Sequence, residues 1–129
     1  MKEIKIGQKA EVFTKVTSDK LAVAVGSGSL KVFATPSMCA LMEEAACAAI
    51  APFLDPGETT VGTALSIEHT SPSPQGVTIT AEAEIKESNG REIMLHVMAF
   101  DAVGEIGHGT HRRYVVDGEK FQTKANLKK

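Results

Sequence analysis

The chain has 129 residues, of which 43% are hydrophobic and 23% charged, and its net charge is −2. This length suits a single domain, and the composition excludes a disordered or low-complexity chain. No basic stripe is interleaved with aromatic residues, which argues against nucleic-acid binding. No apolar run reaches signal-peptide or membrane-spanning length, so we expect a cytoplasmic protein without a membrane partner.

Residues 10–26 predict two short strands around a Ser-Asp turn, and a Gly/Ser-rich connection follows. The next stretch, TPSMCALMEEAACAAIAP, predicts a helix that is apolar on most sides and therefore buried on most sides. Thr35 suits its N-cap, Pro36 its first position and Pro52 its end. Cys39 and Cys47 would lie roughly 12 Å apart on this helix, too far for a disulfide, so we expect buried free thiols in a reducing compartment.

The remainder of the chain predicts four long antiparallel strands. In the first, Val61, Thr63, Leu65, Ile67 and His69 fall on one face by the two-residue period. In the second, residues 77–88 alternate apolar and polar side chains, as a half-exposed strand does. An Asn-Gly pair at 89–90 predicts a hairpin leading into an apolar third strand, and the fourth covers 106–116. The basic tail predicts a short terminal helix.

A single buried helix must be wrapped by the sheet, because nothing else in the chain can cover it. We therefore predict an α+β protein with the hot-dog fold, in which a curved antiparallel sheet wraps one long central helix within one domain, residues 1–129. Such a sheet leaves an edge open, which favours a homodimer.

The central helix also carries adjacent carboxylates, Glu43 and Glu44. Both could lie on an exposed strip or make structural hydrogen bonds. Alternatively, Glu43 faces an apolar site, where loss of solvation would raise its pKa and prepare it as a base or nucleophile. His69 ends its strand face and is either a satisfied edge residue or part of a site. Thr35, besides capping, lies where backbone N–H groups could hold a carbonyl oxygen.

The four histidines show no metal-ligand spacing, so no metal and no cofactor are expected. His108 and His111 fall on opposite faces of their predicted strand, and His96 is expected to be a core or interface residue. From the residues alone, the prediction is a hot-dog domain with a possible Glu/His/Thr site.

Three segments carry a resemblance to a known family: VFATPSMCALMEEAACAAIAPFLDPGE, VGTALSIEHTSPSPQGVTITAEAEI and DAVGEIGHGTHRRYVV. Together they resemble the fluoroacetyl-CoA thioesterase family of hot-dog proteins over about residues 30–125. The resemblance implies a homodimeric acyl-CoA thioesterase, with the coenzyme A thioester as its substrate. It implies that Thr35, Glu43 and His69 are the catalytic residues and that Gly62 lines the substrate pocket.

The resemblance also indicates a difference. The fluoroacetyl-CoA enzyme carries phenylalanines in a lid before FAT, where this chain has Gly26 to Ser29. Because an aromatic lid excludes water, its absence puts fluoroacetyl selectivity in question. As a mechanism, we expect Glu43 to attack the thioester or to activate the water that does. We expect His69 to assist proton transfer and Thr35 to position Glu43 or the substrate oxygen. Arg112, Arg113 or Lys31 are candidates to meet the phosphates of coenzyme A.

A helix that is regular from Pro36 would separate Thr35 from Glu43 by roughly 12 Å along its axis. We therefore expect the helix to begin a few residues later, or a second subunit to contribute to the site. The alternative function is a non-catalytic hot-dog protein that binds coenzyme A or an acyl ligand, since the fold supports many functions. A hot-dog dehydratase is disfavoured, because it would require a different acid–base pair on the helix.

Overall fold

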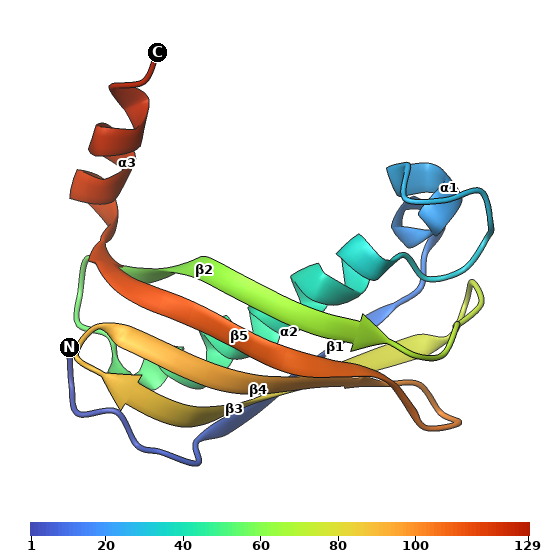
Figure 1. Cartoon of the computed structure of the whole chain (residues 1–129), viewed down its shortest axis with the longest axis horizontal. Coiled ribbons are helices and arrows are strands. Elements are labelled where there is room, and N and C mark those ends of the chain that lie inside the picture. The colour runs from blue at the N-terminus through green and yellow to red at the C-terminus, as the bar shows by residue number, and fades with distance from the viewer.

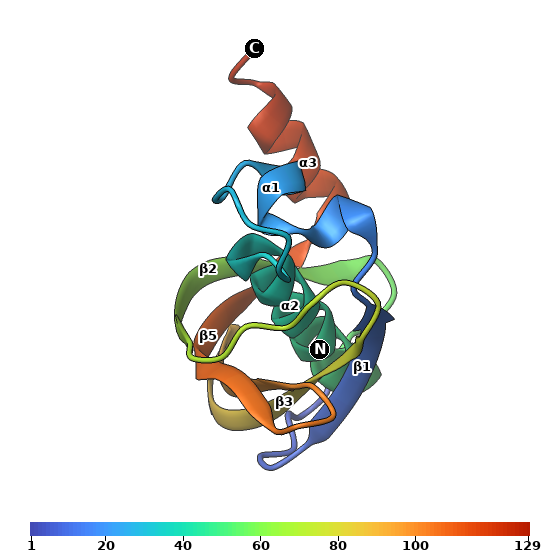
Figure 2. The ribbon, with the colours of Figure 1, turned by 90° about the vertical axis from the view of Figure 1, so that its right-hand side faces the viewer.

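A computed structural model describes all residues, 1–129, and shows one curved sheet with a long helix in its concave face (Figures 1 and 2). The elements in chain order are β1 (Lys9–Lys15), η1 (Ser18–Lys20), α1 (Ala22–Val25), α2 (Thr35–Ile50), η2 (Ala51–Phe53), β2 (Glu58–His69), β3 (Thr78–Asn89), β4 (Glu92–Phe100), β5 (Glu105–Asp117) and α3 (Gly118–Asn126). The predicted hot-dog architecture is thus confirmed.

The five strands are all antiparallel and lie in the order β1-β3-β4-β5-β2. Strands β3, β4 and β5 follow one another as hairpins, and Gly90, at the predicted Asn-Gly turn, adopts a φ of 64° that suits glycine. β2 and β1 form the two edges of the sheet, so each leaves one row of backbone groups unpaired by this chain.

The core lies between α2 and the inner face of the sheet. The alternation predicted for β3 is confirmed, because Ile79, Ala81, Ala83 and Ile85 are fully buried. Alanines on the sheet and on the helix let the two backbones approach closely. The buried residues of α2 are Met38, Leu41, Met42, Ala45, Ala46, Ala49 and Ile50.

Two sequence predictions near the N-terminus are wrong. The second short strand expected within residues 10–26 is instead the pair η1 and α1, because Leu21 and Phe33 make only an isolated bridge and no ladder forms there. The central helix does not begin several residues after Pro36 but at Thr35, with Ala34 as its N-cap. Proline lacks a backbone N–H and has a helical φ, so Pro36 fits the first turn without loss.

A β-bulge at Thr63 changes which side chains of β2 face the helix. The register with β5 shifts between Gly62 and Ala64, so that Gly62 lies opposite Arg113 and His69 opposite Gly107. An extra residue in one strand reverses its alternation. Leu65, Ile67 and His69 therefore share the inner face as predicted, whereas Val61 lies opposite the exposed Tyr114, contrary to the prediction.

Other predictions can be compared with the structure directly. Both cysteines are free thiols, as expected, but neither is buried as predicted, because Cys39 is half-buried and Cys47 is exposed. His111 is buried and His108 is half-exposed on the opposite face of β5, as predicted. The predicted terminal helix is α3. None of the helices combines the length and the apolar character needed to cross a membrane.

Candidate active site

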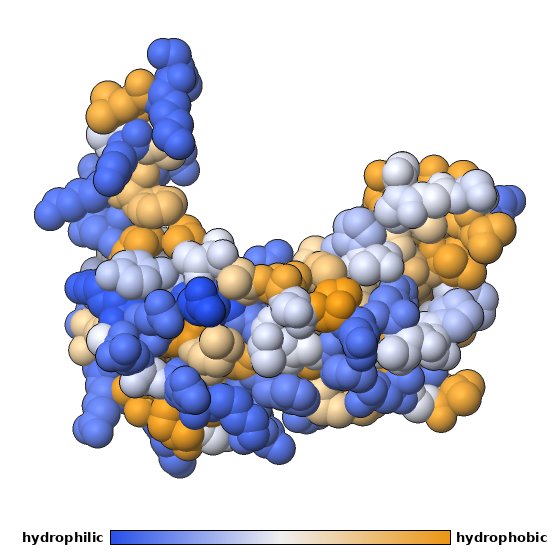
Figure 3. Space-filling view, viewed as in Figure 1, coloured by the Kyte–Doolittle hydropathy of each residue, from blue (hydrophilic) through white to orange (hydrophobic).

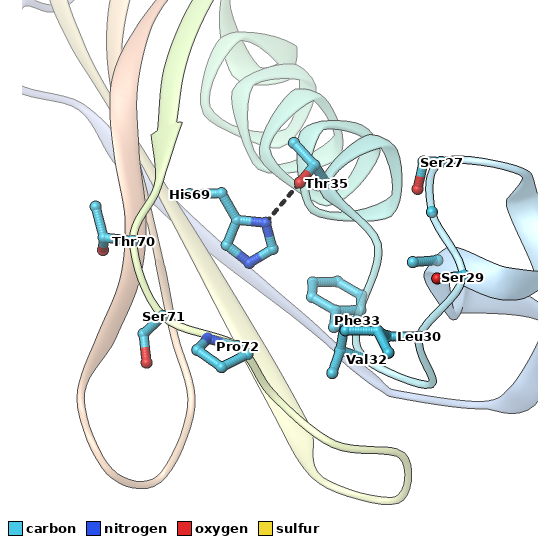
Figure 4. Close-up of a pocket in the computed structure, with 12 residues that line it drawn as sticks. Ser27, Ser29, Leu30, Val32, Phe33, Thr35, His69, Thr70, Ser71 and Pro72 are labelled. Atoms are coloured by element: carbon cyan, nitrogen blue, oxygen red, sulfur yellow. Dashed lines mark hydrogen bonds between the residues drawn. The ribbon is translucent and has the colours of Figure 1, made fainter.

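The N-terminal end of α2 brings a hydroxyl and an imidazole together. Thr35 is the first residue of the helix and His69 is the last residue of β2, and Thr35 Oγ1 lies 2.8 Å from His69 Nδ1 (Figure 4). The expected N-cap role of Thr35 is wrong, because no side chain caps this helix. The hydroxyl is instead hydrogen-bonded to His69.

The environment of His69 favours its neutral form. Burial lowers the pKa of the imidazole below its usual value of 6.5. Its Nε2 atom is buried and makes no hydrogen bond within the chain. In the neutral tautomer with the proton on Nε2, Nδ1 accepts a hydrogen bond from the Thr35 hydroxyl. The pair therefore has the geometry of a base beside a hydroxyl that it can deprotonate.

A pocket of about 410 Å³ opens beside this pair. One wall comes from the segment that contains η1 and α1, residues 18–33, which we name the cap. The other wall is the chain that follows β2, Thr70 to Pro72. The cap contributes Leu30, Val32 and Phe33 together with small polar residues (Figure 4). Because the N-terminus of α2 carries partial positive charge, a carbonyl oxygen held here would be polarised.

Glu43 lies two helical turns further along α2, in different surroundings. Arg113 Nη1 donates a hydrogen bond to Glu43 Oε2 at 3.2 Å, and His111 Nε2 lies 3.7 Å from the same oxygen. The Glu43 side chain is 43% exposed. The apolar surroundings expected for Glu43 are therefore not supplied by this chain, because the carboxylate has a cationic partner and contact with solvent.

Arg113 is almost fully buried, with an exposure of 6%. Its Nε and Nη2 donate to the side-chain and backbone oxygens of Thr60 at 2.8 and 2.9 Å. Its Nη1 donates to His111 Nε2 at 3.0 Å, and His111 Nδ1 in turn donates to the Ala64 carbonyl at 2.8 Å. Burial, reinforced by the Arg113 charge, lowers the pKa of His111, which keeps this ring neutral and able to accept.

Sequence reasoning placed Arg113 only among the candidates for coenzyme A phosphates, and the buried position makes that role wrong. The signal that could have located it is the two-residue period of β5, because Val115 is an evident core position and Arg113 and His111 precede it on the same face. Arg112 points to the outer face and lies near Glu92, whereas Lys31 is exposed on the cap.

Gly62 of β2 lies close to the Glu43 carboxylate. A Cβ atom built on Gly62 would lie 2.8 Å from Glu43 Oε2 and 3.2 Å from His111 Cε1. Any larger residue would therefore displace the carboxylate. Gly62 and Glu43, which the family resemblance placed in one site, are thus neighbours in the structure.

The chain thus forms two separate pairs, Thr35 with His69 and Gly62 with Glu43. Because α2 is regular from Thr35, about 12 Å of helix axis separates the two pairs. No three His, Cys, Asp or Glu side chains are grouped so that they could hold a metal ion. His108, which pairs with Glu68 and Glu105, lies on the opposite face of β5 from the buried His111.

Comparison with known proteins shows which family the chain resembles over most of its length. Residues 16–119 match the model of a family described as fluoroacetyl-CoA-specific thioesterase. The chain is 47% identical over 98 residues to the fluoroacetyl-CoA thioesterase of Streptantibioticus cattleyicolor, covering 76% of this chain and 70% of that protein.

The solved structures show the same likeness over the whole chain. A single-residue variant of the fluoroacetyl-CoA-specific thioesterase FlK superposes with a TM-score of 0.92 at 36% identity, covering 100% of both chains. A thioesterase superfamily member from Thermus thermophilus gives a TM-score of 0.90 at 26% identity, covering 98% of this chain and 94% of that one. The chain therefore belongs to the fluoroacetyl-CoA-specific thioesterase family of hot-dog proteins.

Proposed function

We propose that this protein hydrolyses small acyl-CoA thioesters to the free acid and coenzyme A. The observation that carries the proposal is the hydrogen-bonded pair of Thr35 and His69 at the N-terminus of α2, beside a pocket. One solved variant of FlK, 38% identical to this chain, holds acetyl-CoA, which shows that a related protein accommodates such a thioester.

In the proposed mechanism, the thioester carbonyl lies against the first turn of α2. Neutral His69 accepts a proton from the Thr35 hydroxyl, or from a water held by it, as the oxygen attacks the carbonyl carbon. The carbonyl oxygen becomes an oxyanion that the helix N-terminus stabilises. The carbon–sulfur bond then breaks, and coenzyme A leaves as a thiol after taking the proton from His69. If Thr35 is acylated, a water hydrolyses that ester by the same proton path.

Glu43 completes the site from a second copy of the chain in this proposal. The β2 edge from Thr59 to Ile67 carries no charged residue, whereas the shorter β1 edge carries Lys9 and Lys15. An uncharged, extended edge is the one suited to pairing with another chain. Antiparallel pairing of two β2 strands places Gly62 near the two-fold axis, so the partner subunit's Glu43 can face the Thr35–His69 pair.

The substrate range, the need for a cofactor and the location of the protein are also part of the proposal. The cap at Gly26 to Ser29 offers no aromatic side chain, so we propose a substrate range of short acyl groups and no selectivity for fluoroacetyl. We propose that no cofactor takes part, because the hydroxyl, the imidazole and the carboxylate supply the chemistry. The two free thiols favour a cytoplasmic location.

The experiment that tests the function measures thiol release from a panel of short acyl-CoAs. Wild type is compared with Thr35→Val, His69→Ala and Glu43→Gln, and His69→Ala should reduce kcat by about 10²- to 10⁴-fold. Undiminished activity in all three variants would exclude the proposed residues. Binding of coenzyme A without any turnover would favour the alternative, a non-catalytic hot-dog binding protein.

A complementation experiment tests whether the site is shared between subunits. Glu43→Gln and His69→Ala protomers are mixed and allowed to exchange. In a shared site, half of the dimers are mixed and each has one intact site, so about a quarter of the wild-type activity should return. No recovery, with exchange verified by tagged protomers, would show that Glu43 acts together with the His69 of its own chain.

A further inference from the structure

Two parts of the chain project from the body of the domain. They are α3 at one end and the cap at the other, and both stand on the side of the β2 edge (Figure 1). The space-filling view shows a concave surface between them, with hydrophobic residues on both projections (Figure 3). Of the nine large hydrophobic residues that are exposed, five lie on these two projections: Val23, Val25 and Leu30 on the cap, and Phe121 and Leu127 at α3.

α3 packs only lightly against its own chain, and its Phe121 side chain, which lies beside Tyr114 and Val115, remains 45% exposed. It has nine residues and none of them is buried. Its hydrogen bonds to the preceding chain come from the Asp117 side chain, which caps the helix, and from the Gly118 N–H, which donates to the Gly57 carbonyl. Isolated helices shorter than about 12–15 residues are marginal in water, because most helical stability comes from packing of an apolar side. A partner surface for Phe121 and Leu127 is therefore expected.

Symmetry identifies that surface. α3 begins next to the Glu58 end of β2, since Glu58 pairs with Asp117. The cap lies at the opposite end of the same strand, the end at His69, and the cap and His69 line the same pocket. When two β2 strands pair antiparallel about a two-fold axis, the Glu58 end of one copy lies beside the His69 end of the other. Each α3 then lies next to the cap of the other copy.

We propose that α3 of each subunit packs against the cap of its partner and holds that cap closed over the Thr35–His69 pocket. The occupant of the apolar surface of α3 is thus a second copy of this chain, and the contact is between Phe121 and Leu127 on one subunit and the partner's cap on the other. The inference rests on the dimer proposed above. It adds that the C-terminal helix of one subunit controls access to the active site of the other.

Cross-linking between differently marked chains tests the contact. In a background of Cys39→Ser and Cys47→Ser, one chain carries Phe121→Cys or Leu127→Cys, and a second, longer tagged chain carries Val23→Cys, Val25→Cys or Leu30→Cys. After exchange, a short bismaleimide should link the two chains in at least one combination. Phe13, an exposed phenylalanine on β1, supplies the matched control: Phe13→Cys should give no link to any cap position.

The outcomes separate this inference from the dimer and from the activity. Sedimentation that shows a dimer, with no link in any of the six combinations, would overturn the α3 contact and leave the dimer intact. A monomer by sedimentation would overturn both, whereas thiol release would still report on the hydrolase proposal independently.

Kinetics supply a readout that does not depend on cysteine geometry. Phe121→Ala should raise KM about fivefold or more with little change in kcat, because the partner's cap loses a packed aromatic side chain. Hydrogen exchange of the cap amides should become faster in the same variant. Ile6→Ala, at an exposed position before β1 and outside the cap, should change neither. Equal kinetics and equal cap exchange in Phe121→Ala and wild type would overturn the proposal.

Discussion

Replacing Gly62 by alanine tests whether the position of the Glu43 carboxylate matters for catalysis. The new methyl carbon would lie 2.8 Å from Glu43 Oε2, whereas ordinary contacts begin near 3.4 Å. The carboxylate must therefore retreat by roughly 0.6 Å or more, which weakens its 3.2 Å hydrogen bond from Arg113. A displacement approaching 1 Å at a catalytic group costs up to about 10²-fold in rate, so we expect kcat/KM to fall by about 10- to 100-fold.

The same substitution should have little effect on stability. Glu43 is 43% exposed and can swing aside, and a partly exposed ion pair contributes about 1 kcal/mol or less. Gly62 does not have a positive φ, so alanine also restricts the unfolded chain, which stabilises by about 0.4–1 kcal/mol. The two effects are of opposite sign. The free energy of unfolding, measured by urea denaturation, should therefore change by less than about 1 kcal/mol.

The assay is thiol release from a short acyl-CoA, with Gly118→Ala as the matched control. The Cβ atom at Gly118 would meet its nearest neighbours at 3.5 Å, which is ordinary contact, so activity and stability should both be retained. If Gly62→Ala keeps full activity while Glu43→Gln loses it, the exact placement of the carboxylate is irrelevant. If Gly62→Ala unfolds the protein, the buried neighbours His111 and Arg113, which the Cβ atom would approach to 3.2 and 3.3 Å, do not give way as the reasoning requires.

Three further outcomes are expected. Because burial lowers the pKa of His69 below 6.5, kcat/KM should be constant above that value and fall as the pH drops through the lowered pKa; an acid limb above pH 6.5 would contradict the assignment of His69 as the base. Burial lowers the pKa of His111 as well, so the unfolded state binds a proton at a higher pH than the folded state does. The free energy of unfolding, measured in urea, should therefore be at its full value above about pH 6.5 and decline below it. A free energy of unfolding that rises on acidification would contradict the lowered pKa. Gly109→Ala should lower the free energy of unfolding by roughly 3 kcal/mol or more and lower Tm by about 10 °C. The reason is that its Cβ would overlap the Ser66 carbonyl oxygen, a backbone atom of the paired strand β2. An unchanged Tm would contradict this close approach of the two strands.

Much of the fold could be predicted because it depends on local patterns. The alternation in β3 reports a sheet with one buried face, and the Asn-Gly pair reports the hairpin that follows. Where local pattern and tertiary context disagree, prediction failed. Residues 21–25 have β-forming composition but become a helical turn, because no neighbouring strand is available to pair with them.

The candidate site shows the same division. The residues of the site were identifiable by type and spacing with the help of the family resemblance. Their surroundings were not, since the apolar environment expected for Glu43 is replaced by the buried guanidinium of Arg113. That guanidinium comes from a strand 70 residues away, and a contact over such a separation leaves no mark in the local pattern.

By itself, the sequence determined that one apolar helix needs a sheet around it, because each buried side chain must find an apolar partner and the strands are the only source. Only the tertiary structure decided which residues meet. The bulge at Thr63 reverses the alternation of β2, so that Gly62 and His69, seven residues apart, both face α2. A regular helix from Thr35 then holds Glu43 about 12 Å from the Thr35–His69 pair, because each residue adds a fixed rise along the axis.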